Sequence, residues 1–128
     1  MKKEIQNWMD SAKYDLETAE YMFKTKRYIY TVFMCHLALE KLLKAKVQLL
    51  IGKTPPRTHD LEYLSVLAEL TPDKDREQFI VELSNLSVVT RYPDDFQRIK
   101  RNFSRTRANG ILRMTKETFT WIKKSSKL

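Results

Sequence analysis

Apolar residues recur every three or four positions along the first part of the chain. The residues that share this spacing are Ile5, Trp8, Met9, Ala12, Leu16, Ala19 and Phe23. A period close to 3.6 places them on one face of an α-helix, which buries them and leaves the polar face in solvent. The pattern therefore predicts an amphipathic helix from about Lys3 to Lys24.

The next segment is apolar on every side of a helix. Between Tyr28 and Leu39 the chain has no lysine, arginine or acid, and a polar face opens only from Glu40. Gly52 suits a left-handed helix end, and the two prolines shortly after it cannot continue a helix, so a helix from Tyr28 to Ile51 is predicted. A helix that is apolar around its whole circumference needs a central position or a partner subunit, and we expect both.

Two shorter patterns follow. Residues 60–70 carry leucines at three-residue intervals, which predicts a short third helix. Thr71, Pro72 and Asp73 are then the residue types of an N-cap, a first-turn proline and an acid near the positive end of a helix dipole. They predict a fourth helix that continues to about Val89.

The last part of the chain is divided by a proline. Pro93 interrupts the helical periodicity, so residues 91–102 are expected to form a loop. A final helix is predicted to begin near Ser104, and Gly110 inside it would suit a close crossing of two helices. No strand-like alternation persists over four residues. We therefore expect an all-α antiparallel bundle in a single domain over residues 1–128.

Composition narrows the class of protein. With 42% hydrophobic residues, two glycines and four prolines, the chain is unlike disordered or turn-rich β proteins. The chain has a single cysteine, Cys35, so it can form neither an internal disulfide nor a cysteine-based zinc site. Cys35 lies in an apolar stretch, which predicts that it is buried. A single cysteine also fits a reducing cytoplasm. No uncharged apolar stretch reaches the roughly 20 residues that span a bilayer, so no membrane insertion or secretion is expected.

Positive charge is concentrated near the C-terminus. The net charge is +8, and residues 1–90 carry 13 Lys/Arg and 13 Asp/Glu, whereas residues 91–128 carry 11 Lys/Arg and 3 acids. This asymmetry favours a nucleic acid or an acidic protein as partner, with a solvated surface as the alternative. Phe96 and Phe103 flank the basic segment and either stack on unpaired bases or hold the segment to the core. The candidate nucleic-acid contacts are Arg98, Lys100, Arg101, Arg105 and Arg107.

Four short motifs, in this order and at this helical spacing, resemble the HEPN family of small helical domains. They are AKYDLETA at residues 12–19, LALEKLLKA at residues 37–45, THDL at residues 58–61 and RYPD at residues 91–94. The resemblance covers most of the chain. It implies an up-and-down four-helix bundle with an additional short helix, often a homodimer.

The resemblance also implies partners. Many family members are encoded beside, or fused to, a minimal nucleotidyltransferase, in pairs interpreted as toxin and antitoxin, and the family is linked to nucleotide binding and RNA cleavage. Positions that match the motifs are expected to line a polar cleft that takes a nucleotide. They are Asp15, Glu40, Lys41, Lys44, His59, Arg91, Tyr92 and Asp94.

Two of these positions have a structural alternative. His59 would help to cap the third helix. Pro93 would fix a turn, with Tyr92 packed on the bundle. Asp94 or Asp95 would either accept turn amides or pair with Arg91.

The ribonuclease members of the family use an arginine followed, after four to six residues, by a histidine. In this chain eight residues separate Arg27 from His36, one separates Arg57 from His59, and no histidine follows Arg91. We therefore expect no catalytic residues of this type. Neither a metal site nor a cofactor is expected, because the sequence has no metal-ligand spacing and no glycine-rich phosphate loop.

The leading interpretation, which follows from the family resemblance, is a non-catalytic HEPN domain that is associated with a nucleotide or RNA. It would act as a homodimer and as the partner of a minimal nucleotidyltransferase in a toxin–antitoxin-type pair. Two alternatives remain: a ribonuclease toxin with rearranged residues, and a stand-alone RNA-binding or assembly module. Growth arrest and RNA cleavage on expression alone would favour the first alternative. Salt-sensitive RNA binding without a partner would favour the second.

Overall fold

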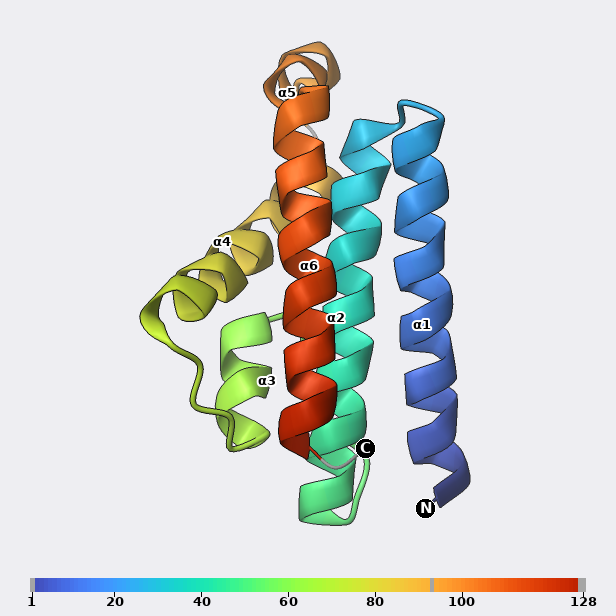
Figure 1. Cartoon of the computed structure of the whole chain (residues 1–128), viewed down its shortest axis with the longest axis vertical. Coiled ribbons are helices and arrows are strands. Elements are labelled where there is room, and N and C mark those ends of the chain that lie inside the picture. The colour runs from blue at the N-terminus through green and yellow to red at the C-terminus, as the bar shows by residue number, and fades with distance from the viewer. Residues whose placement is uncertain (1, 93, 127–128) are drawn as a thin grey trace.

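The computed structural model describes residues 2–92 and 94–126, and within these ranges its regular structure is entirely helical. This confirms the all-α fold class, and the helices pack as an up-and-down bundle (Figure 1). The helices are α1 (Lys2–Lys24), α2 (Tyr28–Ile51), α3 (Leu61–Leu67), α4 (Lys74–Arg91), α5 (Phe96–Asn102) and α6 (Arg105–Ser126).

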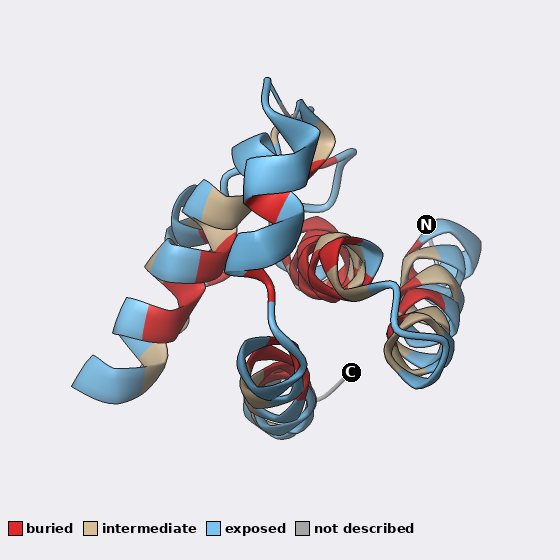
Figure 2. Ribbon diagram, turned by 90° about the horizontal axis from the view of Figure 1, so that it is seen from above, coloured by how far each residue is buried: buried red, intermediate tan, exposed pale blue. Residues whose placement is uncertain are grey.

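The second helix occupies the middle of the bundle, as its apolar circumference predicts. Seen from above, α2 is enclosed by α1 on one side, α6 on another, and α3 and α4 on a third (Figure 2). Leu39, Leu42 and Leu43 of α2 are fully buried. Burial is not complete along the helix, however, because Tyr30 at its start is 49% exposed and residues 49–51 at its end are all exposed.

The apolar stripe of α1 packs against α2 along its whole length. Ala12 and Ala19 are fully buried at this contact. Their small side chains let the two helices approach closely. Lys26 adopts a left-handed conformation (φ 64°) in the turn that reverses the chain into α2.

Several predicted boundaries shift. The third helix ends at Leu67 rather than near residue 70, with Glu69 in a left-handed conformation (φ 56°) just after it. The N-cap position of α4 is Asp73, not Thr71, and α4 continues to Arg91 instead of ending at Val89. The final helix begins as predicted, because the Ser104 hydroxyl accepts a hydrogen bond from the Arg107 amide at 3.1 Å.

The prediction of a loop over residues 91–102 was wrong. Residues 96–102 form α5, so the bundle carries two short additional helices rather than one. The Asp95 carboxylate caps α5 by accepting a hydrogen bond from the Arg98 amide at 3.2 Å, and Ile99 is buried against the bundle. A local cap and one buried side chain stabilise a short helix here although the segment lacks clear periodicity.

Gly110 does not mark a close helix crossing, contrary to expectation. A Cβ atom placed there would meet no neighbouring atom within 4 Å. We therefore expect Gly110→Ala to raise the free energy of unfolding by about 0.5–1 kcal/mol, since alanine is the better helix former. Denaturant unfolding of the variant and the unmodified protein measures this difference in free energy.

Gly52 is the control. Its φ of +74° is left-handed, so Gly52→Ala should destabilise the protein. A loss of stability at both positions would contradict the assignment.

None of the helices in the described ranges is both long enough and apolar enough to cross a membrane.

Candidate functional site

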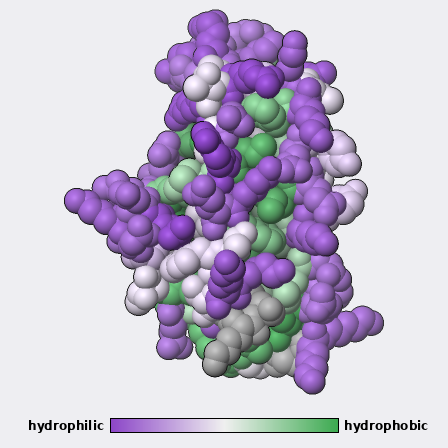
Figure 3. Space-filling model, viewed as in Figure 1, coloured by the Kyte–Doolittle hydropathy of each residue, from purple (hydrophilic) through white to green (hydrophobic). Residues whose placement is uncertain are grey.

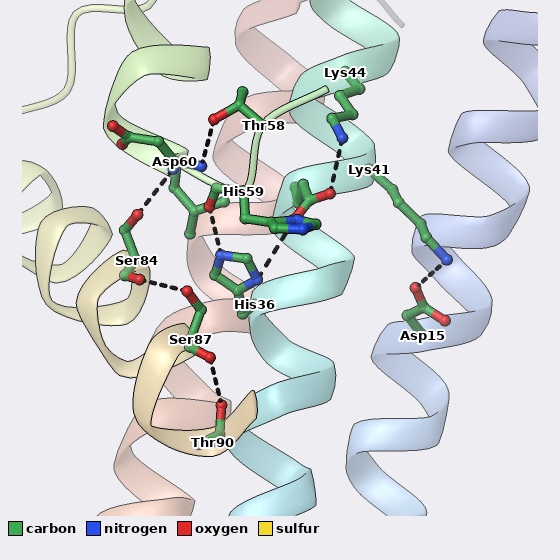
Figure 4. Close-up of polar contacts among 12 residues, drawn as sticks. Asp15, His36, Lys41, Lys44, Thr58, His59, Asp60, Ser84, Ser87 and Thr90 are labelled. Carbon is green, nitrogen blue, oxygen red and sulfur yellow. Dashed lines mark hydrogen bonds and ion pairs between the residues drawn. The ribbon is translucent and has the colours of Figure 1, made fainter. Parts of the chain in front are cut away.

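A buried carboxylate on α2 is the centre of the main polar cluster. Glu40 is only 4% exposed. Its Oε2 accepts a hydrogen bond from Lys44 Nζ, one helical turn further on, at 2.9 Å. Its Oε1 accepts another from His59 Nδ1 at 2.8 Å (Figure 4). The structure therefore brings together three of the motif positions, Glu40, Lys44 and His59, from α2 and from the segment before α3.

His59 is held from two directions. Its backbone carbonyl lies 2.8 Å from Nε2 of His36, which must donate the hydrogen because a carbonyl only accepts (Figure 4). Its ring nitrogen Nδ1 donates to the Glu40 carboxylate, so in the neutral form of the ring the lone pair is on Nε2. Because 56% of the His59 side chain is exposed, it presents an oriented imidazole to solvent. Such a group can accept a hydrogen bond or a proton.

The charge states of the cluster follow from burial and pairing. Burial opposes ionisation of Glu40, but the hydrogen bonds from Lys44 and His59 outweigh it and hold the pKa of this carboxyl below its usual 4.5. Burial also lowers the pKa of His36 below 6.5, against the opposing effects of the His59 carbonyl and the Glu40 charge. Near neutral pH the cluster therefore contains an ionised Glu40 and a neutral His36.

A hydrogen bond to α4 holds the segment that carries His59. The Ser84 hydroxyl accepts a hydrogen bond from the Leu61 amide at 3.0 Å (Figure 4). His59 does not cap α3, contrary to the structural alternative, because the Asp60 carboxylate accepts the Tyr63 amide at the cap. Beside this segment lies a hollow of about 290 Å³, lined by His59, Asp60 and Ser84 among others.

Arg91 lies at the C-terminal end of α4 and contacts α2 at a different point. Its guanidinium carbon lies 4.9 Å from the centre of the Phe33 ring, which is a cation–π contact. Its Nη2 atom is buried without a hydrogen-bond acceptor among the described residues. Tyr92 is 73% exposed, so the expectation that it packs on the bundle was wrong. Asp94 is exposed, and the predicted turn at Pro93 lies outside the described residues.

Asp15 and Lys41 form a separate pair between α1 and α2. Their Oδ2 and Nζ atoms are 2.7 Å apart (Figure 4). Lys41 also donates a hydrogen bond to the Ser11 hydroxyl. Asp15 is buried. This ion pair joins the two longest helices, whereas Glu40 and His59 lie on the side of α2 that faces α3. The motif positions therefore do not line one continuous cleft.

The basic segment lies at the end of the molecule where α5 meets the turn between α1 and α2. All five predicted cations are exposed: Arg98, Lys100, Arg101, Arg105 and Arg107. Lys26 and Arg27 from the turn line a hollow of about 320 Å³ together with Lys100. The surface over this end is mostly hydrophilic (Figure 3). Cations from three parts of the chain thus gather at one end of the bundle.

The two phenylalanines of this segment differ in role. Phe103 is 2% exposed and packs into the core, with the Arg107 guanidinium 4.8 Å from its ring centre. Phe96 is 45% exposed. The two alternatives from the sequence therefore apply to different residues: Phe103 holds the segment to the core, and Phe96 is available for contacts.

The comparisons with known proteins decide the family. The sequence matches the HEPN domain family over residues 5–125. The chain belongs to the HEPN family. The structure is similar to that of TT1696 from Thermus thermophilus (TM-score 0.78, 22% identity, covering 94% of this chain and 97% of that one). It is also similar to ST0689, an archaeal HEPN homologue (TM-score 0.75, 23% identity, covering 95% and 97%). No curated protein matches the sequence.

One member of the cluster in this HEPN chain was not predicted from the sequence. His36 is fully buried and donates a hydrogen bond to the His59 carbonyl, yet it is not among the predicted site residues. The available signal was its spacing of four residues from Glu40, which places both side chains on one face of a helix.

The expected burial of Cys35 is confirmed: it is fully buried, and burial raises the pKa of its thiol to about 12. Within residues 2–92 and 94–126, no three side chains gather as metal ligands.

Proposed function

We propose that this HEPN protein associates with RNA, or with a nucleotide, through its basic end, and that it does so without cleaving RNA. The observation that carries the proposal is the gathering of Arg98, Lys100 and Arg101 with Lys26 and Arg27 at one end of the bundle. Lysine and arginine attract phosphates, and a cluster of them binds a nucleic-acid backbone by releasing its counterions. The only acids on the α5 segment, Asp94 and Asp95, precede the helix.

Charge reversal on α5 tests the proposal. We expect Arg98→Glu/Arg101→Glu to weaken binding of a fluorescently labelled RNA at least tenfold near physiological salt. It should also lower the slope of log affinity against log salt by about one for each phosphate that the variant no longer neutralises. Fluorescence anisotropy at several salt concentrations measures both quantities.

The matched control reverses two exposed lysines at the opposite end of α6, Lys123→Glu/Lys124→Glu. It changes the net charge by the same amount (Figure 1). This control should lower the affinity much less, because the charges lie far from the basic end. Equal losses of RNA affinity in both variants would mean that the effect comes from net charge alone. Failure of the unmodified protein to bind RNA would refute the proposal.

The proposed biological setting is a homodimer that works with a minimal nucleotidyltransferase in a toxin–antitoxin-type pair. Membership of the HEPN family supports this setting. The exposed aliphatic side chains at the end of α2, Leu49, Leu50 and Ile51, support self-association because such a patch is stabilised when it is covered. A neighbouring reading frame with a G-S-x-x-x-G-x-x-x-S-D/E-x-D motif, and a dimer mass in sedimentation, are the expected findings.

A specific geometry favours a second candidate, a ribonuclease with rearranged residues. The Glu40 carboxylate holds Nδ1 of His59 while 56% of the His59 side chain stays exposed, an arrangement that suits general acid–base catalysis. The same RNA samples distinguish the two candidates. Intact RNA after incubation supports the first, whereas cleavage that His59→Gln abolishes supports the second.

A further inference from the structure

Two hollows lie side by side at the basic end and share part of their lining. One has a volume of about 320 Å³ and the other about 210 Å³, and both are lined by Ile29, Tyr30 and Phe96. Tyr30 belongs to the first turn of α2 and Phe96 begins α5. Two half-exposed aromatic rings from distant parts of the chain therefore separate a pair of adjacent hollows.

Each hollow has positive charge at its edge. Lys26, Arg27 and Lys100 line the larger one, and Arg91 lines the smaller one. Of the residues that the structure describes, no aspartate or glutamate lines either hollow. The site thus combines apolar ring surface with cations, and its charge is complementary to that of phosphate.

We infer that these two hollows bind unpaired nucleotides of a single-stranded RNA, with bases against Tyr30 and Phe96 and phosphates against the surrounding cations. This inference rests on the proposed RNA binding and specifies its substrate class. Cations alone bind duplex and single strands alike, because both carry phosphates. Aromatic rings at a hollow add affinity only for bases that have left a stack, since paired bases in a duplex present no free face.

The place of Arg91 follows from this arrangement. It matches a family motif, but it lies at the hollow shared by Tyr30 and Phe96 rather than in hydrogen-bonding contact with the Glu40 carboxylate. Its guanidinium already lies over the Phe33 ring, which fixes its position. The positive charge of Arg91 at the edge of the smaller hollow would attract a phosphate bound there.

Removing one ring at a time tests the inference. Tyr30→Ala and Phe96→Ala are each expected to weaken binding of a labelled ten-nucleotide single-stranded RNA by about tenfold, because stacking of a base on an aromatic side chain contributes about 1–3 kcal/mol. Binding of the same sequence as a duplex should stay within about twofold of the unmodified protein. Fluorescence anisotropy measures the affinities, and circular dichroism verifies the fold.

Tyr63→Ala is the matched control. Tyr63 is 48% exposed, close to the 49% of Tyr30, and both are the third residue of their helices, but Tyr63 lies on α3. Tyr63→Ala should leave the affinities for the single-stranded and the duplex RNA unchanged.

The outcomes separate this inference from the proposal on which it rests. If Tyr30→Ala and Phe96→Ala have no effect, or weaken duplex binding equally, the inference is wrong. In that case, if Arg98→Glu/Arg101→Glu still weakens RNA binding, the proposal that the basic end binds RNA remains supported. Absence of RNA binding by the unmodified protein would overturn both.

Discussion

Leu39→Ala is expected to lower the free energy of unfolding by about 3–5 kcal/mol. Leu39 is fully buried in the middle of α2, the helix that all the other helices contact. Truncation removes transfer free energy and leaves a cavity that rigid neighbouring helices cannot fill. Urea unfolding followed by circular dichroism, with α-helical signal as the readout, measures the loss.

Leu50→Ala is the matched control, since it makes the same change in the same helix. Leu50 is 42% exposed, so its truncation should cost less than about 1 kcal/mol. A small effect of Leu39→Ala would contradict the central position of α2. A large effect of Leu50→Ala, which disappears on dilution, would instead indicate that a second copy covers the end of the helix.

Glu40→Gln is expected to destabilise the protein by about 2 kcal/mol near pH 7. The substitution keeps the shape and an acceptor oxygen but removes the negative charge that Lys44 and His59 contact. Lys44 is then left buried without its counter-ion, which costs more than the loss of an ordinary hydrogen bond. Urea unfolding of both proteins measures the difference.

The pH dependence of that difference identifies its cause. Because the pKa of Glu40 is held below 4.5 in the folded protein, the carboxylate contributes stability that is present above about pH 4.5 and is lost as the pH falls through the folded pKa. The difference in free energy of unfolding between Glu40→Gln and the unmodified protein should therefore be smaller below pH 4.5 than at pH 7. Glu82→Gln, at an exposed position of α4, should have little effect at either pH. A gap that is independent of pH would contradict the ion pairing of Glu40.

Much of the fold was predictable because helical periodicity is a local property. The bounds of α2 agree with the prediction at both ends, since a cap glycine and prolines mark its end. The start of α6 near Ser104 was predictable for the same reason. By contrast, α5 was missed, because a seven-residue helix depends on one capping aspartate and on the burial of Ile99 against distant residues.

The candidate site was only partly predictable. The motif resemblance singled out Glu40, Lys44 and His59, which the structure brings into contact. Spacing along the chain says which face of a helix a residue occupies, but not which helix will cover that face. Asp15 and Lys41 for that reason turned out to pair with each other, while His36 joined the cluster through a backbone carbonyl that no sequence pattern marks.

The amino-acid order alone thus specified an all-helical chain with an apolar second helix and an excess of positive charge near its C-terminus, because periodicity, caps and composition act over short distances. The tertiary structure decided that Lys26 and Arg27 lie beside Lys100. It also decided that Tyr30 and Phe96 share two hollows. These side chains are separated by more than sixty positions in the sequence, and only the packing of α5 against the start of α2 brings them together.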